Sequence, residues 1–146
     1  NVVAEGPSVV IHADQALFDR DPFVRSLHEG SGVLSASLES TVTMQEAERQ
    51  VLAFLKEHVA ERSSPLCGNS IHTDRHFLRL QMPAVENYLF YRCIDVSTFK
   101  ELARRWAPAV YLEAEKRKAN KIHRAKNDIL QSIDELKFYR EQFLKD

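Results

Sequence analysis

Two acids and one histidine in this chain are candidates for a catalytic or metal-binding site. Asp74 lies in CGNSIHTDRHFL (residues 67–78), after a Gly-Asn-Ser turn and inside a helical pattern. His123 and Asp128 lie in IHRAKNDI (residues 122–129), five positions apart. Carboxylates bind hard cations, and histidine transfers protons near neutral pH. The two segments are therefore the first places to look for a site.

Each of these residues also has a structural explanation. In the first turn of a helix, the helix dipole favours a carboxylate such as Asp74. His123 alone is explained as a solvated residue in a basic stretch, and Asp128 as an exposed helical residue. Positions five apart on a helix do not share a face. A shared site therefore requires His123 in the loop or at the helix entrance, with Asp128 inside the helix.

Strand and helix signals alternate along the chain, and they determine how these residues are positioned. Thr43 and Glu46 have the capping-box spacing, followed by apolar residues at helical intervals, which predicts a helix over 44–60. Ser97 is expected to cap a later helix. The pattern predicts strands over 2–12 (with a turn), 65–67 and 88–96, helices over 72–80, 98–107 and 122–143, and a short helix and loop over 19–34. This order predicts an α/β sandwich with a mixed sheet.

Length and composition narrow the class of protein. The 146 residues predict one domain, 1–146, and 20 basic against 21 acidic residues argue against a surface that coats nucleic acid broadly. The strongest basic run, between Lys116 and Lys126, is either a solvated face or a local attraction for phosphodiesters. Cys67 and Cys93 lack zinc-ligand spacing and are expected as buried thiols in a reducing compartment. Trp106 is expected in the core, and no apolar run is long enough to cross a membrane.

Three blocks carry a family resemblance: CGNSIHTDRHFL, YRCIDVSTFKELARRW and HRAKNDI. In order and spacing they resemble the oligoribonuclease branch of the DEDDh 3′-to-5′ exonucleases. The resemblance extends from AEGP at Ala4 to FYREQF, which ends at Phe143. Three long blocks in the right order are far more specific than a lone acid or one histidine pair.

The resemblance implies a ribonuclease H-like fold, with a mixed β-sheet flanked by helices. It also implies a metal-dependent 3′-to-5′ exoribonuclease that degrades short oligoribonucleotides to mononucleotides. Its cofactors would be two divalent ions, Mg²⁺ or Mn²⁺, which can stabilise the attacking and leaving oxygens of a phosphodiester displacement. By position, Asp74 and Asp128 would be metal ligands, and His123 would be the general base.

The resemblance also implies base contacts and a partner subunit. Phe23 would stack on a base and His28 would line the substrate pocket, although a core ring and a surface histidine are the structural alternatives. The family is dimeric, so Tyr91 would reach the active site of the neighbouring protomer. We therefore expect a homodimer.

A second group of positions would contact the phosphate farthest from the cleaved bond. Ser70 and Ser97 would enclose it and Arg92 would pair with it, which would favour very short substrates. For both serines, helix capping is the structural alternative.

One family motif is absent from these residues. No Asp-x-Glu pair occurs in the sequence, so two of the four metal-binding acids are not supplied by it. We expect that motif, on the first strands of the fold, upstream of Asn1, and the resemblance makes activity conditional on it. The alternative is an inactive homologue that serves as an RNA-binding or scaffold subunit. The expected location is cytoplasmic or mitochondrial.

Overall fold

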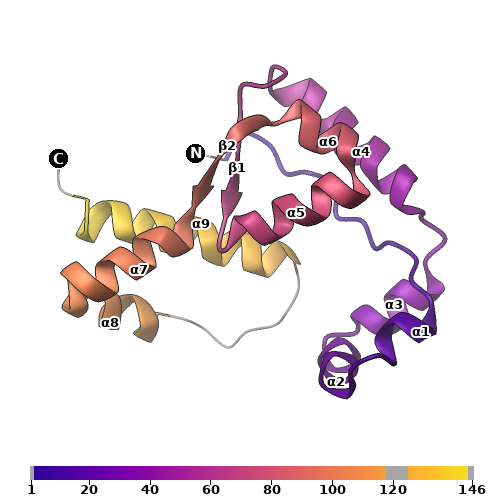
Figure 1. Cartoon of the computed structure of the whole chain (residues 1–146), viewed down its shortest axis with the longest axis horizontal. Helices are drawn as coiled ribbons and strands as arrows, with labels where there is room; N and C mark the ends of the chain where they lie inside the picture. The colour runs from indigo at the N-terminus through magenta and orange to yellow at the C-terminus, as the bar shows by residue number, and fades with distance from the viewer. Residues whose placement is uncertain (1, 118–124, 145–146) are drawn as a thin grey trace. The chain divides into compact units, whose positions relative to one another are not determined.

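The computed structural model describes residues 2–117 and 125–144. The chain divides into two compact units, residues 1–64 with 77–90 and residues 65–76 with 91–146 (Figure 1). Helices are present in both units, and the second also contains a sheet. These elements confirm the predicted α/β class, while the single domain over 1–146 stays a prediction.

The first unit is helical. Its elements are α1 (Gln15–Phe18), α2 (Pro22–Gly30), α3 (Val33–Glu39), α4 (Met44–His58) and α6 (Pro83–Tyr88). As predicted, Thr43 caps α4, because its Oγ1 accepts the Glu46 amide at 3.2 Å. Glu48 on α4 accepts the Ala84 amide of α6 at 2.7 Å. That bond satisfies one of the amides left open at the start of α6 and joins the two helices.

The predicted strand and turn over residues 2–12 are wrong. Residues 2–13 form neither strand nor helix, although β-branched residues are frequent there. The segment is held by separate contacts: the His12 amide donates to Val42 O at 2.8 Å, and Ser40 Oγ donates to Val10 O at 2.6 Å. Val2 and Val3 are 70% and 86% exposed. Strand propensity is realised only where a ladder and a packed face are available.

The second unit places a small sheet beside three helices. Strands β1 (Pro65–Gly68) and β2 (Phe90–Asp95) pair, and α5 (Ile71–Gln81) begins after β1. The helices are α7 (Val96–Trp106), α8 (Pro108–Lys116) and α9 (Ala125–Gln142). These elements confirm the predicted strands near 65 and 90 and the predicted helices. Helices α6 and α8 were not predicted, because Pro83 and Pro108 mark the first helical turn as well as a helix end.

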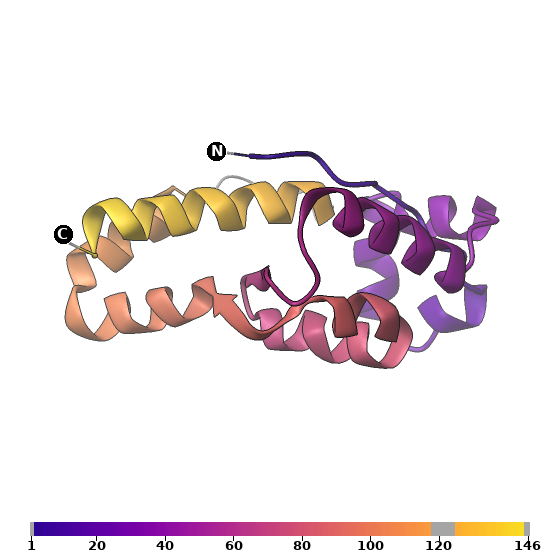
Figure 2. The ribbon, with the colours of Figure 1, turned by 90° about the horizontal axis from the view of Figure 1, so that it is seen from above.

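The core of this unit lies where α7, α8 and α9 meet, and Figure 2 shows α9 as a long helix running beside the other two. Small and large side chains alternate there: Val96 and Ala103 on α7, Ala114 on α8, and Phe138 and Tyr139 on α9. Val96, Ala103 and Tyr139 are 0% exposed. The alanines let the helices approach closely enough for the two rings of α9 to fill the space.

Three burial predictions are wrong. Cys67 and Cys93 are free and exposed, and Trp106 is 71% exposed. The cysteines lie on β1 and β2, which form a sheet of two strands within the described residues, so each strand has few neighbours to cover it. Trp106 is the last residue of α7, beyond the helix crossing. Apolar local sequence therefore did not determine burial at these positions.

None of the helices within 2–117 and 125–144 combines the length and apolar character needed to span a membrane.

Candidate active site

The Gly-Asn-Ser turn joins β1 to α5 and is fixed to α9. Asn69 Nδ2 donates to Ser132 Oγ at 3.1 Å and to Glu135 Oε2 at 3.0 Å. Ser70, the next residue, has a φ of 51°, in the left-handed region that non-glycine residues seldom adopt. The turn thus holds Ser70 in an unusual conformation next to the helix that carries Asp128.

Both predicted acids begin helices. Asp74 is in the first turn of α5 and Asp128 in the first turn of α9, and both are exposed. This confirms the predicted helical positions. Across the described part of the chain, neither carboxylate has a hydrogen bond or an ion pair. His123 lies outside the described residues, and α9 as described begins two positions later, at Ala125. Within residues 2–117 and 125–144, both carboxylates are thus available to a ligand.

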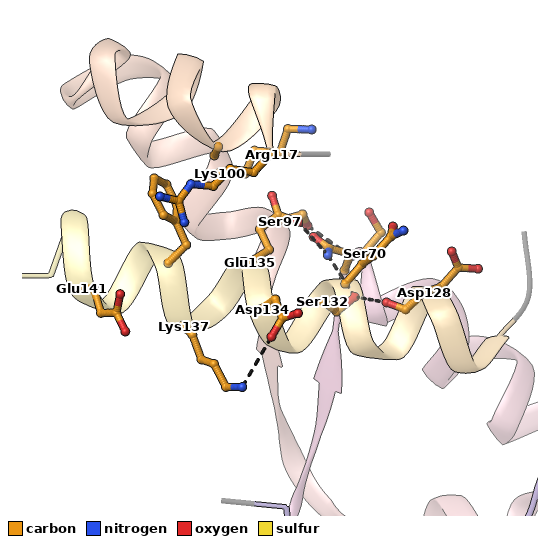
Figure 3. A pocket seen from close by; sticks show the side chains of 14 residues that line it. Ser70, Ser97, Lys100, Arg117, Asp128, Ser132, Asp134, Glu135, Lys137 and Glu141 are labelled. Carbon is orange, nitrogen blue, oxygen red and sulfur yellow. Dashed lines mark hydrogen bonds and ion pairs between the residues drawn. The ribbon is translucent and has the colours of Figure 1, made fainter. Parts of the chain in front are cut away.

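A pocket of about 840 Å³ opens in the second unit (Figure 3). It brings together three of the predicted site residues, Ser70, Ser97 and Asp128, whereas Asp74 does not line it. The other lining residues come from the β1–α5 turn, α7, the end of α8 and α9: Asn69, Lys100, Ala114, Arg117, Gln131, Ser132, Asp134, Glu135, Lys137, Phe138 and Glu141. Acidic and basic groups therefore share one space, as a site for both cations and phosphate requires.

Two cations in this pocket come from α7 and from the C-cap of α8. Lys100 pairs with Glu115 at 3.3 Å. The Arg117 guanidinium lies 4.4 Å from the centre of the Phe138 ring and 3.6 Å from Glu113. Arg117 belongs to the basic run found in the sequence. Lys100 was missed, although its position three residues after Ser97 places both on one face of a helix.

Ser97 does not cap α7, contrary to expectation. Asp95 is the N-cap, and its carboxylate accepts the Ser97 amide at 3.0 Å. Asp95 Oδ2 also lies 3.7 Å from His72 Nδ1. The acid preceded Ser97 in the sequence and is itself a preferred cap. Its role could thus have been found from sequence alone.

The pKa of the Asp95 carboxyl is set by two opposing effects. Partial burial raises it, but hydrogen bonds from Ser97 and Ser70, together with the nearby His72, lower it more, and the pKa lies below its ordinary value. The folded state therefore favours the ionised form. Its stabilising contribution is present above the unfolded pKa of ~3.9 and is lost as the pH falls through the folded pKa.

We expect the second unit to lose stability on acidification below about pH 4, in part through Asp95. The Asp95→Asn variant keeps an oxygen acceptor but does not titrate, so its unfolding midpoint should depend less on pH in this range. Denaturant unfolding of both proteins between pH 2.5 and 6, at matched salt, measures the difference. If the unfolding midpoints of the two proteins changed equally with pH, Asp95 would not be the source of the acid sensitivity.

Tyr91 and Arg92 lie on β2 and do not line the pocket. Arg92 Nε donates to the Tyr91 hydroxyl at 2.9 Å, and its guanidinium lies 5.4 Å from the centre of that ring. Tyr91 is 68% exposed. Arg75 Nη1 donates to the backbone oxygens of Tyr91 and Arg92 at 2.8 and 3.2 Å. The strand is thereby fixed while both side chains remain accessible.

Phe23 and His28 belong to the first unit, on α2. Asp21 caps this helix by accepting the Phe23 and Val24 amides. Phe23 is 76% exposed, so the alternative in which it is a core ring is wrong. His28 is half-buried and makes an edge contact with Phe18, with ring centres 5.6 Å apart. The Phe23 ring therefore presents a face on which a base could stack.

Carboxylate oxygens are donor atoms that the described residues offer to a metal ion. Within residues 2–117 and 125–144, no three His, Cys, Asp or Glu side chains gather as a metal site. The carboxylates of Asp74 and Asp128 are oxygen donors without a partner among these residues, which suits a hard divalent ion. Their chemistry fits such a cofactor, and further ligands would have to complete the coordination.

Comparison with known proteins agrees with the sequence blocks. The profile of the Exonuclease family matches residues 1–136. The oligoribonuclease of Pseudomonas syringae pv. tomato is 51% identical over 146 residues, which are 99% of this chain and 79% of that protein. The oligoribonucleases of Bordetella pertussis and Halorhodospira halophila are 50% and 51% identical, each over 99% of this chain and 78% of the relative. The similarity therefore covers both units.

Proposed function

Because the chain belongs to the oligoribonuclease branch of the exonuclease family, we propose that it degrades short oligoribonucleotides to mononucleotides from the 3′ end. The observation that carries this proposal is the pocket in which the Asp128 carboxylate lies with Ser70, Ser97, Lys100 and Arg117. Such a pocket offers an oxygen ligand for a cation and donors for phosphate oxygens.

The proposed chemistry is phosphodiester hydrolysis by water. Asp74 and Asp128 would supply carboxylate oxygens to two divalent ions, Mg²⁺ or Mn²⁺. When bound, the ions provide charge stabilisation for the attacking and leaving oxygens. His123 would take the proton of the attacking water, as a general base near neutral pH. Lys100 and Arg117 attract the substrate backbone electrostatically.

Substrate length would be set by contacts at the two ends of the oligonucleotide. Phe23 would stack on a base and His28 would lie beside it. Ser70, Ser97 and Arg92 would bind the phosphate farthest from the cleaved bond, which would favour very short substrates over longer chains. We also propose a homodimer in which Tyr91 reaches the partner's site, and its 68% exposure supports this role.

The test uses the intact protein, with any residues that flank these 146. A 5′-labelled pentaribonucleotide and a 5′-labelled diribonucleotide are incubated with Mn²⁺, with and without a chelator. We expect successively shorter labelled fragments from the longer substrate and mononucleotide from the shorter one, both lost on chelation. Immediate release of labelled mononucleotide from the pentamer would contradict the 3′-to-5′ direction. Binding without cleavage by folded protein would favour an RNA-binding scaffold instead.

A further inference from the structure

Asp95 is the centre of a hydrogen-bond network that joins two residues lining the pocket. Its Oδ1 accepts three bonds, from the Ser70 amide at 2.9 Å, the Ser97 amide at 3.0 Å and the Ser97 hydroxyl at 2.5 Å. The Asp95 side chain is 22% exposed and does not itself line the pocket, whereas both serines do. One carboxylate therefore connects the turn after β1 to the start of α7.

The two serines do not offer the same atoms to a ligand. A serine hydroxyl has one proton to donate, and Ser97 donates it to Asp95. Ser97 Oγ also accepts the Ser70 amide at 3.2 Å, as Figure 3 shows. The Ser70 hydroxyl has no partner within the described residues. In this arrangement, Ser70 is the serine whose proton is available to a phosphate oxygen.

The backbone of Ser70 needs the same network. A φ of 51° is unfavourable for a residue with a Cβ. Such a conformation persists only where surrounding contacts hold it, and it often marks a functional position. The contacts here are the bonds from the Ser70 amide to Asp95 and Ser97. Removing the carboxylate would let Ser70 relax and would turn its hydroxyl away from its present position.

We propose that Asp95 is a positioning residue for the 5′-terminal phosphate: it holds Ser70 in its left-handed conformation and binds the Ser97 proton, so that Ser70 donates to the phosphate. This inference rests on the proposed function, in which both serines face that phosphate. In this role Asp95 would touch neither the substrate nor the reacting atoms. Its expected influence is on discrimination between substrates with and without a 5′ phosphate.

Two variants separate this role from helix capping. Asp95→Ser keeps a side chain that caps helices well, but it is too short to reach the Ser70 amide. Asp95→Asn keeps both the length and an oxygen acceptor. The intact proteins are assayed with 5′-phosphorylated and 5′-hydroxyl diribonucleotides, and the ratio of the two kcat/KM values is the readout. The thermal unfolding midpoint of each variant shows whether the N-cap of α7 still contributes to stability.

The ratio is expected to fall about tenfold in Asp95→Ser, as for loss of one hydrogen bond to a charged group, and to stay within about threefold of wild type in Asp95→Asn. An unchanged ratio in Asp95→Ser, equal losses in both variants, or a wild-type ratio near one would overturn the proposal. If wild type cleaves neither dinucleotide, the proposed function fails. The same ratio, taken from dissociation constants, then decides the role of Asp95.

Discussion

Replacing Asp128 with asparagine is expected to lower the hydrolysis of short oligoribonucleotides by at least about a hundredfold. The substitution preserves volume and removes the negative charge that a divalent ion requires. Asp128 is an exposed residue in the first turn of α9, and its carboxylate is unpaired among the described residues. No structural contact should therefore be lost with the charge. The initial rate of mononucleotide release, at saturating Mn²⁺, measures the effect.

The same helix provides a matched control for that variant. Asp134 also lines the pocket, but it is paired with Lys137 at 3.4 Å. Asp134→Asn should keep activity within a few-fold, because an exposed ion pair contributes at most about 1 kcal/mol to stability. Equal losses in both variants would indicate a general electrostatic effect of the pocket. Full activity in the Asp128→Asn variant would exclude Asp128 as a metal ligand.

Replacing Tyr139 with alanine is expected to destabilise the second unit by roughly 3–5 kcal/mol, the usual range for truncating a buried aromatic side chain. The Tyr139 ring is 0% exposed and lies in the cluster formed by α7, α8 and α9. Alanine would leave a cavity that this close-packed crossing cannot fill. The free energy of unfolding in denaturant, followed by far-ultraviolet circular dichroism, measures the loss.

Tyr139→Phe separates the ring from the hydroxyl. The hydroxyl donates to Glu135 Oε1 at 3.4 Å, and burial together with Glu135 raises its pKa. A long hydrogen bond of this kind contributes little, so the phenylalanine variant should unfold within about 1 kcal/mol of wild type. If alanine cost no more than phenylalanine, the ring would not be a core residue.

The elements that sequence predicted well are those with local signals. The helix from Met44 to His58 followed from a capping threonine and apolar periodicity, and both are present. Helices α5, α7 and α9 were also predicted from local patterns, although the cap of α7 is Asp95 and not the predicted Ser97. The family match and the mixed elements agree with the ribonuclease H-like class. The segment over residues 2–12 failed because strand formation depends on a pairing partner, which local sequence does not specify.

The site was predicted only in part, for a similar reason. Ser70, Ser97 and Asp128 were identified through the sequence blocks, and the structure brings them to one pocket. The contacts that position them could not be predicted, because Asn69 and Ser132 are 63 positions apart in the sequence. Lys100 lies in the second block but was not identified as a site residue. Nothing in the residue pattern indicated the left-handed Ser70. Functional side chains have characteristic types, whereas the residues that position them are determined by the tertiary fold.

Helix α9 carries Asp128 in its first turn and the buried Tyr139 eleven residues later. A small change of tilt at Tyr139 would therefore move Asp128 by a larger distance. At 1.5 Å per residue, the helix between Asp128 and Tyr139 is about 16 Å long. A tilt of about 5° at the buried end would move the Asp128 end by roughly 1.4 Å. Displacements of about 1 Å can reduce catalysis a hundredfold. A core substitution too mild to unfold the protein could therefore still misalign Asp128, so natural variation at the far end of α9 would be constrained by precision as well as by stability.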